Sequence, residues 1–242
     1  MANGLLVRVA IDSTSGGWVG PCNNSGGFCY VPMGDSSTLT TAYNTSYKPY
    51  EIAVNEFLPI NAHPATRWPS QLPSAGHFDP DFYNLSFGDA NRRGARIHNN
   101  LDIGDFIVFY AGLRSIHTGK LCYSIIGFYE IEQLLFAKNV PINEWHRNEH
   151  TRPKGCLNPD PNEIVVFAKP GKSGRLLSHI PIGSYFNRAY RIQPEILEEW
   201  GGLDVKGGYI QRSIFLPAFL NGDRFLQWFQ RQNPQFIQFN NP

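Results

Sequence analysis

Two short clusters of ionisable side chains could carry chemistry in this sequence, and the first begins at Asp12. The run Asp12-Ser13-Thr14-Ser15-Gly16-Gly17 follows an apolar stretch directly and is rich in glycine and short polar side chains. The backbone N–H groups of such a turn can bind a phosphate, and a carboxylate at the end of a strand can act as a general base. A turn in which Asp and Ser side chains satisfy backbone donors would have the same composition. The pattern leaves both interpretations open.

The second cluster is the run His77-Phe78-Asp79-Pro80-Asp81. In an extended chain the side chains of His77, Asp79 and Asp81 project to the same side. Such a group could pair a general acid with a base, or hold a metal ion. The alternative is a loop in which the Asp side chains cap neighbouring turns.

The pair His77-x-Asp79 also resembles the iron-binding pair of the oxygenases that depend on 2-oxoglutarate. Those enzymes need a distal His and a later Arg for the oxoacid, and His179 and Arg188 have a suitable order and spacing. Two His and one carboxylate suit non-haem iron, so an iron oxygenase is one alternative function. The four cysteines form no C-x-x-C pair, so we expect no structural zinc site, and the sequence indicates no particular cofactor.

A third group of residues is basic. Arg92 and Arg96 are four positions apart and would share a helix face, and Arg114 follows an apolar run. A second basic stretch, 146–154, follows Trp145, and arginine beside an aromatic ring suits a phosphate backbone and a stacked base. The alternative is an ordinary solvated face. The net charge is +1, so any nucleic-acid contact must come from a local patch.

Strands and turns must position these residues. Hydrophobic residues make up 42% of the chain and charged residues 17%, which excludes a disordered chain, while 23 Gly and 18 Pro favour strands and turns over a helical bundle. We expect strands over 4–11, 28–33, 106–110, 121–131, 164–168, 189–192 and 209–215. We expect helices over 89–101 with Asp89 as N-cap, over 194–200 with Pro at its first turn, and over 225–231, and a short helical turn over 132–137.

The predicted fold is α+β, with a mixed or barrel-like β-sheet and a few peripheral helices. Residues 1–231 would form a single domain and 232–242 a polar C-terminal tail. The first apolar run, 5–11, is too short to span a membrane, and no signal-peptide pattern is present. We therefore expect a cytoplasmic protein with unpaired thiols and no membrane partner.

The ordered motifs resemble the third of the nucleotide-modification-associated domain families. The resemblance rests on the Asp12–Gly17 turn, the Gly20-Pro21 step, the His77–Asp81 element, the run from Gly104 to Arg114 and the late Leu216-Pro217. It extends over about residues 5–228. Members of this family occur mainly in prokaryotes and viruses and are inferred to act with DNA base modification. The resemblance therefore implies DNA, or a nucleotide, as the partner.

A weaker resemblance concerns the fold. The run from Gly104 to Tyr110, followed by the strand through Ile131, is similar to the strand pair of PUA-like domains. Those domains are small barrels that hold a flipped or modified base in a pocket, where aromatic walls reduce the cost of unstacking. Tyr110, Tyr123, Tyr129 and Trp18 are candidate walls.

The expected function is DNA or nucleotide modification, with a base or nucleotide bound in a polar-aromatic pocket. The expected chemistry is a glycosidic or group-transfer reaction at a nucleoside; a non-catalytic reader of modified bases and the iron oxygenase are the alternatives. The reactive group would be Asp12, His77, Asp79 and Asp81. The residues that contact the substrate would be Ser13, Ser15, Gly16, Gly17, Trp18 and Tyr110, and those that pair with phosphates Arg92, Arg96 and Arg114. We further expect Asp12 and the element 77–81 to lie in one pocket.

Overall fold

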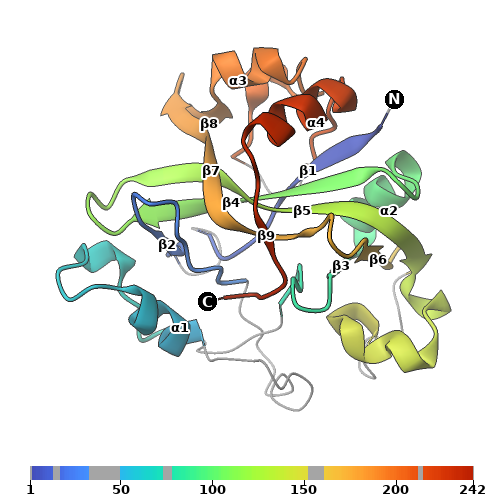
Figure 1. The fold of residues 1–242 in the computed structure, drawn as a ribbon, viewed down its shortest axis with the longest axis horizontal. Coiled ribbons are helices and arrows are strands. Elements are labelled where there is room, and N and C mark those ends of the chain that lie inside the picture. Colours follow the sequence, from blue (N-terminus) through green and yellow to red (C-terminus); the bar gives the residue numbers. More distant parts are fainter. Residues whose placement is uncertain are drawn as a thin grey trace.

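The centre of the molecule is a mixed β-sheet with helices around it (Figure 1). The computed structural model describes residues 2–12, 17–32, 50–72, 78–151, 161–211 and 215–241. The described strands are β1 (Gly4–Arg8), β2 (Pro21–Cys22), β3 (Ser86–Asp89), β4 (Phe106–Ser115), β5 (Leu121–Phe136), β6 (Ile164–Ala168), β7 (Gly174–Phe186), β8 (Ala189–Ile192) and β9 (Phe236–Ile237). The described α-helices are α1 (Tyr50–Phe57), α2 (Asn91–Asn100), α3 (Pro194–Glu199) and α4 (Gly222–Arg231).

The long strand β5 organises the sheet. Its first part pairs antiparallel with β4 and, on the other side, with β7, whereas its last part pairs with β6. The change of partner comes with a register shift between Ile131 and Gln133, and such irregularities bend a strand. β1 and β2 pair with β4 in parallel, so the sheet is mixed as predicted. It is not closed into a barrel, which corrects the barrel-like expectation.

Both faces of the sheet are covered. Leu5 and Val7 of β1 belong to a core with α1 and Ile97 of α2, whereas Leu6 belongs to a second core with the aromatic residues of α4. Figure 1 shows α3 and α4 above the sheet and α1 below it. Because both faces are buried, strands β1 and β4 are apolar at nearly every position. We call these two sides the α1–α2 face and the α3–α4 face.

The predicted antiparallel pairing of 106–110 with 121–131 is confirmed, as is the helix at 194–200. The helical turn predicted over 132–137 is wrong, because β5 continues to Phe136 and pairs with β6 there. The segment 28–33 is not a strand in its described part, where only Phe28 forms a single bridge, to Cys22. Strand β7 was not predicted, because its exposed polar positions interrupt the apolar pattern.

Asp89 is not the N-cap of α2. It is the last residue of β3, and the cap position falls on Ala90, which makes no side-chain capping bond. The Asp89 carboxylate instead accepts a hydrogen bond from the Ala90 N–H and pairs with Arg93. An ion pair one turn into the helix has replaced the capping interaction.

The C-terminal segment, expected to be a polar tail, packs on the sheet. Its residues Phe236 and Ile237 form β9 beside β7. The side-chain amide of Asn240 accepts a hydrogen bond from the Phe82 N–H and donates one to the Asp81 carboxylate. The side-chain amide of Asn241 accepts a hydrogen bond from the Tyr30 N–H and donates one to the Tyr30 carbonyl. These amides join the last residues to the α1–α2 face.

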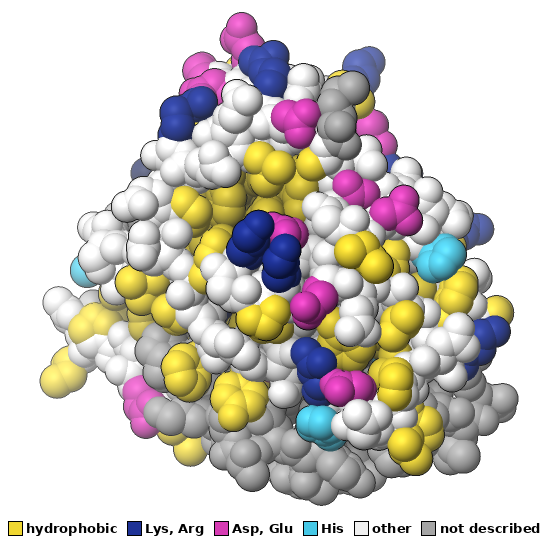
Figure 2. Space-filling view, turned by 45° about the vertical axis from the view of Figure 1, so that its right-hand side comes forward, with side chains coloured by type: hydrophobic (Ala, Val, Ile, Leu, Met, Phe, Trp, Pro, Cys, Tyr) yellow, Lys and Arg dark blue, Asp and Glu magenta, His cyan; other side chains and the backbone are white. Residues whose placement is uncertain are grey.

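The surface carries charges of both signs. Figure 2 shows one face, on which several basic side chains lie beside acidic ones and hydrophobic side chains line a hollow near the centre. Within the described residues, no helix is long and apolar enough to cross a membrane. Cys22, Cys29 and Cys122 have unpaired thiols, as expected.

Candidate functional site

A buried ion pair lies where β1 ends. Arg8 is the last residue of the strand, and its Nη2 is 3.0 Å from Oδ2 of Asp12, with the two side chains only 6% and 8% exposed. Between them Ala10 has a left-handed backbone (φ 69°), which costs an L-residue about 1–2 kcal/mol. Backbone hydrogen bonds from Val9 to Tyr110 and from Ile11 to Val31 hold this turn on both sides. The turn brings the Asp12 carboxylate beside the guanidinium of Arg8, four residues earlier in the chain.

The Arg8 guanidinium has further partners on the α3–α4 face. Its Nη1 donates to the Gln211 carbonyl, and its Cζ lies 5.0 Å from the centre of the Tyr123 ring. The neighbouring Tyr110 hydroxyl donates to the Ile210 carbonyl at 2.7 Å. Nε of Arg8 is buried and has no hydrogen-bond partner among the described residues. A buried donor without a partner is rare in folded proteins and calls for an explanation.

A pocket of about 680 Å³ lies on the same face. It is formed by the end of the β7–β8 hairpin, by α3, by the segment 204–209 and by Phe215, and we call it the β8–α3 pocket. Its charged lining residues are Arg191, Asp204 and Lys206. Tyr209 lines it, and two residues later the Gln211 carbonyl contacts Arg8, so one segment joins the pocket to the Arg8–Asp12 pair.

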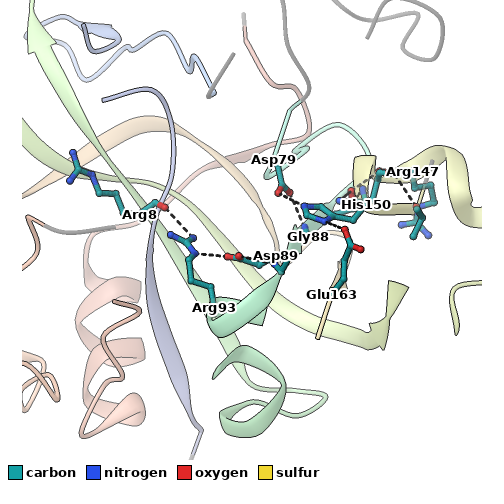
Figure 3. A network of polar contacts seen from close by, with 12 residues as sticks. Arg8, Asp79, Gly88, Asp89, Arg93, Arg147, His150 and Glu163 are labelled. Carbon is teal, nitrogen blue, oxygen red and sulfur yellow. Dashed lines mark hydrogen bonds and ion pairs between the residues drawn. The ribbon is translucent and has the colours of Figure 1, made fainter. Parts of the chain in front are cut away.

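A second, partly buried cluster contains His150 between two carboxylates (Figure 3). Its Nε2 is 3.4 Å from Oδ2 of Asp79, and its Nδ1 is 2.5 Å from Oε1 of Glu163. Burial lowers the pKa of His150, but its hydrogen bonds with Asp79 and Glu163 outweigh that effect and raise the pKa to about 10. The ring also packs on Gly88, where a Cβ would lie 2.1 Å from it. The histidine is therefore a fixed cation at neutral pH.

Arg93 links the backbone of Arg8 to Asp89, which follows Gly88 in the chain. Its Nε is 2.7 Å from Oδ2 of Asp89, and its Nη2 donates to the Arg8 carbonyl at 3.5 Å. Burial raises the pKa of Asp89, and Arg93 opposes that shift. Figure 3 shows that the Arg8 side chain points away from Arg93, so only its carbonyl belongs to this network.

The two clusters lie on different faces of the sheet. Arg8 packs with Tyr110 and Tyr123, which belong to the core of the α3–α4 face. Asp79 follows Phe78 and accepts a hydrogen bond from the Gly88 N–H, next to Phe87, and both phenylalanines belong to the core of the α1–α2 face. The arrangement does not match the expectation of one pocket shared by Asp12 and the element 77–81.

Asp81 holds a turn. Its carboxylate accepts hydrogen bonds from the Tyr83 and Asn84 N–H groups and from the side-chain amides of Asn84 and Asn240. The residue is 2% exposed. With both oxygens bonded in this way, the carboxylate fixes the chain from 81 to 86.

The expected substrate-contacting residues are only partly described. Ser13, Thr14, Ser15, Gly16 and His77 lie outside the described residues. Gly17 is exposed with a positive φ of 76°. Trp18 and Tyr110 are buried, and Trp18 packs edge-on against Trp68. Neither of these two aromatic residues lines the β8–α3 pocket.

The three candidate phosphate ligands have different environments. Arg96 pairs with Asp204 at 2.5 Å and donates to the Leu216 carbonyl at 2.8 Å. Arg114 donates to the Gly119 carbonyl within the β4–β5 hairpin. Arg92 is exposed on α2. Arg92 and Arg96 are both on the helix that the sequence predicted.

The iron-oxygenase alternative gains no support from the described part of the chain. His179 of β7 lies 3.0 Å from the Ser124 hydroxyl and against Phe28, and burial lowers its pKa. Asp79, the other member of the expected iron site, instead contacts the Gly88 N–H and the His150 ring. Within the described ranges, no three His, Cys, Asp or Glu side chains are grouped to hold a metal ion.

Sequence reasoning missed Arg8 and Glu163, and it placed Arg93 and His150 only among basic residues for nucleic-acid contact, not in ion pairs with carboxylates. A signal for Arg8 was present, because a lone charge inside the apolar strand GLLVRVAI needs a partner, and Asp12 follows four residues later. The contact between His150 and Asp79 has no such signal, because 71 positions separate the two residues.

Comparison with known proteins gives one match. Residues 3–201 match the model of the family described as nucleotide modification associated domain 3. No curated protein and no solved structure matches the chain. The matched range includes both ionic clusters and ends between α3 and Asp204, so the β8–α3 pocket is partly inside it.

Proposed function

The chain belongs to the family of nucleotide modification associated domain 3, and from this we propose that it binds a base or nucleotide beside Arg8 and Asp12 and modifies it. Membership indicates a role in nucleotide or DNA modification. The observation that carries the finer proposal is the buried Arg8–Asp12 pair, in which Nε of Arg8 lacks a partner among the described residues. A ligand acceptor at that atom would satisfy it.

The proposed reaction depends on the carboxylate of Asp12. Asp12 would take a proton from an attacking group as general base, or stabilise positive charge that develops on the sugar when a glycosidic bond breaks. Arg8 would position Asp12 by the ion pair and donate to an anionic oxygen of the ligand. Ser13, Ser15, Gly16 and Gly17 follow directly in the sequence, and we keep them as proposed phosphate or sugar contacts.

The Asp79–His150–Glu163 cluster has a different proposed role. A histidine with a pKa raised to about 10 is a poor general base at neutral pH. Asp79 and Asp81 are hydrogen-bonded to the backbone of β3 and of the turn before it. We assign these residues to holding the fold beneath the site, and Asp12 to the reaction.

The test compares the parent with Asp12→Asn, which keeps the size of the side chain and removes its charge. Both proteins are incubated with deoxynucleotides, single strands and duplexes, and products are read by mass spectrometry, with binding measured separately. We expect a modified product from the parent, turnover at least roughly a hundredfold lower in the variant, and similar binding. The exposed Glu195→Gln is the matched control.

Two outcomes would contradict the proposal. Binding by the parent without any product would make the protein a reader of bases, the non-catalytic alternative. An absence of binding to every nucleotide and oligonucleotide would overturn the site as a whole.

A further inference from the structure

The β8–α3 pocket has walls suited to a flat, apolar ligand. Phe186, Tyr209 and Phe215 line it together with aliphatic residues of β8, α3 and the segment before Tyr209. Phe215 is 56% exposed although it is a large apolar side chain. Exposed aromatic rings around a concave surface are typical of ligand sites, and nucleic-acid bases stack on such rings with little dependence on sequence.

One of the two cations that line the pocket, Arg191, is held in place by the chain beside it. Nη1 of Arg191 donates to the carbonyls of Lys206 and Gly207 at 3.0 and 3.1 Å, and its Cζ lies 5.6 Å from the centre of the Tyr209 ring. Gly207 has a left-handed backbone (φ 57°), and a Cβ there would meet Nη1 at 3.1 Å. Glycine therefore lets the chain turn closely around the guanidinium.

The charge of Arg191 is not neutralised by a carboxylate among the described residues, and its Nε is buried without a hydrogen-bond partner there. Asp204, the acid that lines the pocket, is engaged elsewhere, with Arg96 at 2.5 Å and with the Ala218 N–H at 2.7 Å. Lys206 adds an exposed ammonium group. The pocket thus combines aromatic walls with two cations, which is complementary to a base that carries a phosphate.

We propose that the β8–α3 pocket binds one nucleoside monophosphate unit, with the base against Phe215 and the phosphate at Arg191 and Lys206. The unit could be a free nucleotide or one nucleotide of a DNA strand, since both present the same base and phosphate. This inference rests on the proposed function and deepens it, because the segment from Tyr209 to Gln211 joins the pocket wall to Arg8.

The first experiment measures the affinity of the intact chain for deoxynucleoside monophosphates and for the matching nucleosides. Phe215→Ala should weaken both about tenfold, since one stacking contact is lost. Lys206→Ala should weaken the monophosphate several-fold and leave the nucleoside unchanged. Ile103→Ala and Lys120→Ala are matched controls, because both residues are exposed and neither lines the pocket.

A second arm separates the two sources of the nucleotide. Tighter binding of a short single strand than of the monophosphate identifies a strand as the ligand, and equal or weaker binding identifies the free nucleotide. Because Phe215 and Lys206 are exposed, their variants should fold, and a thermal melt confirms it. Affinity unaltered by Phe215→Ala, or no binding of any monophosphate, would overturn the proposal.

The inference and the proposed function fail in different ways. If Phe215→Ala weakens binding while Asp12→Asn keeps full turnover, the pocket stands and the role of Asp12 is wrong. If Asp12→Asn abolishes turnover while Phe215→Ala changes nothing, the role of Asp12 stands and the nucleotide lies elsewhere.

Discussion

The two ionic clusters of this protein, one buried and one partly buried, use similar groups in opposite ways. On the α1–α2 face, His150 has a carboxylate at each ring nitrogen. On the α3–α4 face, Arg8 holds Asp12 but retains a buried Nε without a partner among the described residues. The first cluster engages both ring nitrogens of its histidine with carboxylates, whereas the second leaves one donor without a partner among the described residues. Charge held away from solvent does not by itself identify a site; the unpartnered Arg8 donor is the difference between the two clusters.

The difference matters because desolvation penalises both clusters. A buried ion pair is often no more stabilising than apolar residues of the same shape, whereas removal of one partner leaves a costly unpaired charge. The cluster on the α1–α2 face offsets this cost through the two carboxylates at His150 and the hydrogen bond from the Gly88 N–H to Asp79. In the Arg8–Asp12 pair, Nε of Arg8 has no partner among the described residues. A ligand that accepts a hydrogen bond from this atom would offset that part of the desolvation cost.

The largest expected effect is on stability at the α1–α2 cluster. His150→Gln removes the cation between Asp79 and Glu163 and leaves two partly buried carboxylates without it, so the free energy of unfolding should fall by about 3 kcal/mol, the low end for a broken buried pair. Urea denaturation measures it. The exposed His117→Gln is the control and should change stability by less than about 0.5 kcal/mol. A small effect of His150→Gln would show that this cluster is not structural.

A double substitution tests the other cluster. Arg8→Met alone should cost about 3 kcal/mol, because Asp12 is left buried without its cation. Arg8→Met combined with Asp12→Leu should recover most of that loss and still abolish nucleotide binding and turnover. Denaturation and binding are measured on both proteins. A double variant that is stable and still active would remove the functional distinction between the clusters.

The titration of His150 gives the next effect. Its pKa is raised from 6.5 to about 10 in the folded state, so its stabilisation is fully present below pH 6.5 and is lost as the pH rises through 10. At about 1.4 kcal/mol per pH unit, reduced slightly near each pKa, the free energy of unfolding should fall by about 2.5 kcal/mol between pH 7 and 9. Denaturation at several pH values measures this slope, and His150→Gln should reduce it. An equal slope in that variant would assign the titration to another group.

The smallest effect concerns the exposed basic residue of α2. Arg92→Ala should weaken oligonucleotide binding only two- to threefold and lower the salt dependence by about 0.9 in the log–log slope, as expected for one phosphate contact. Binding of a nucleoside should not change. Affinities at two salt concentrations measure both quantities. An unchanged salt slope would make Arg92 a solvated side chain that contacts no phosphate.

Part of the fold followed from local patterns. The run Phe106–Tyr110 and the stretch 121–131 are rich in β-branched and aromatic residues, and they pair as predicted. Pro194 marked the first turn of α3 correctly. The strand predicted over 4–11 ends earlier, at Arg8, and Asp12 follows a turn through Ala10 rather than the strand directly. Each of these features depends on residues close together in the chain.

The sequence by itself determined most of the core strands, helix α3, the family resemblance and Asp12 as a candidate carboxylate. Only the tertiary structure decided that Arg8 holds Asp12 on one face, that His150 joins Asp79 and Glu163 on the other, and that Asn240 completes the shell of Asp81. The physical reason is range. Burial on both faces makes the central strands continuously apolar, which the sequence records, whereas an ion pair or a pocket depends on which distant segments the folded sheet brings within a few ångströms.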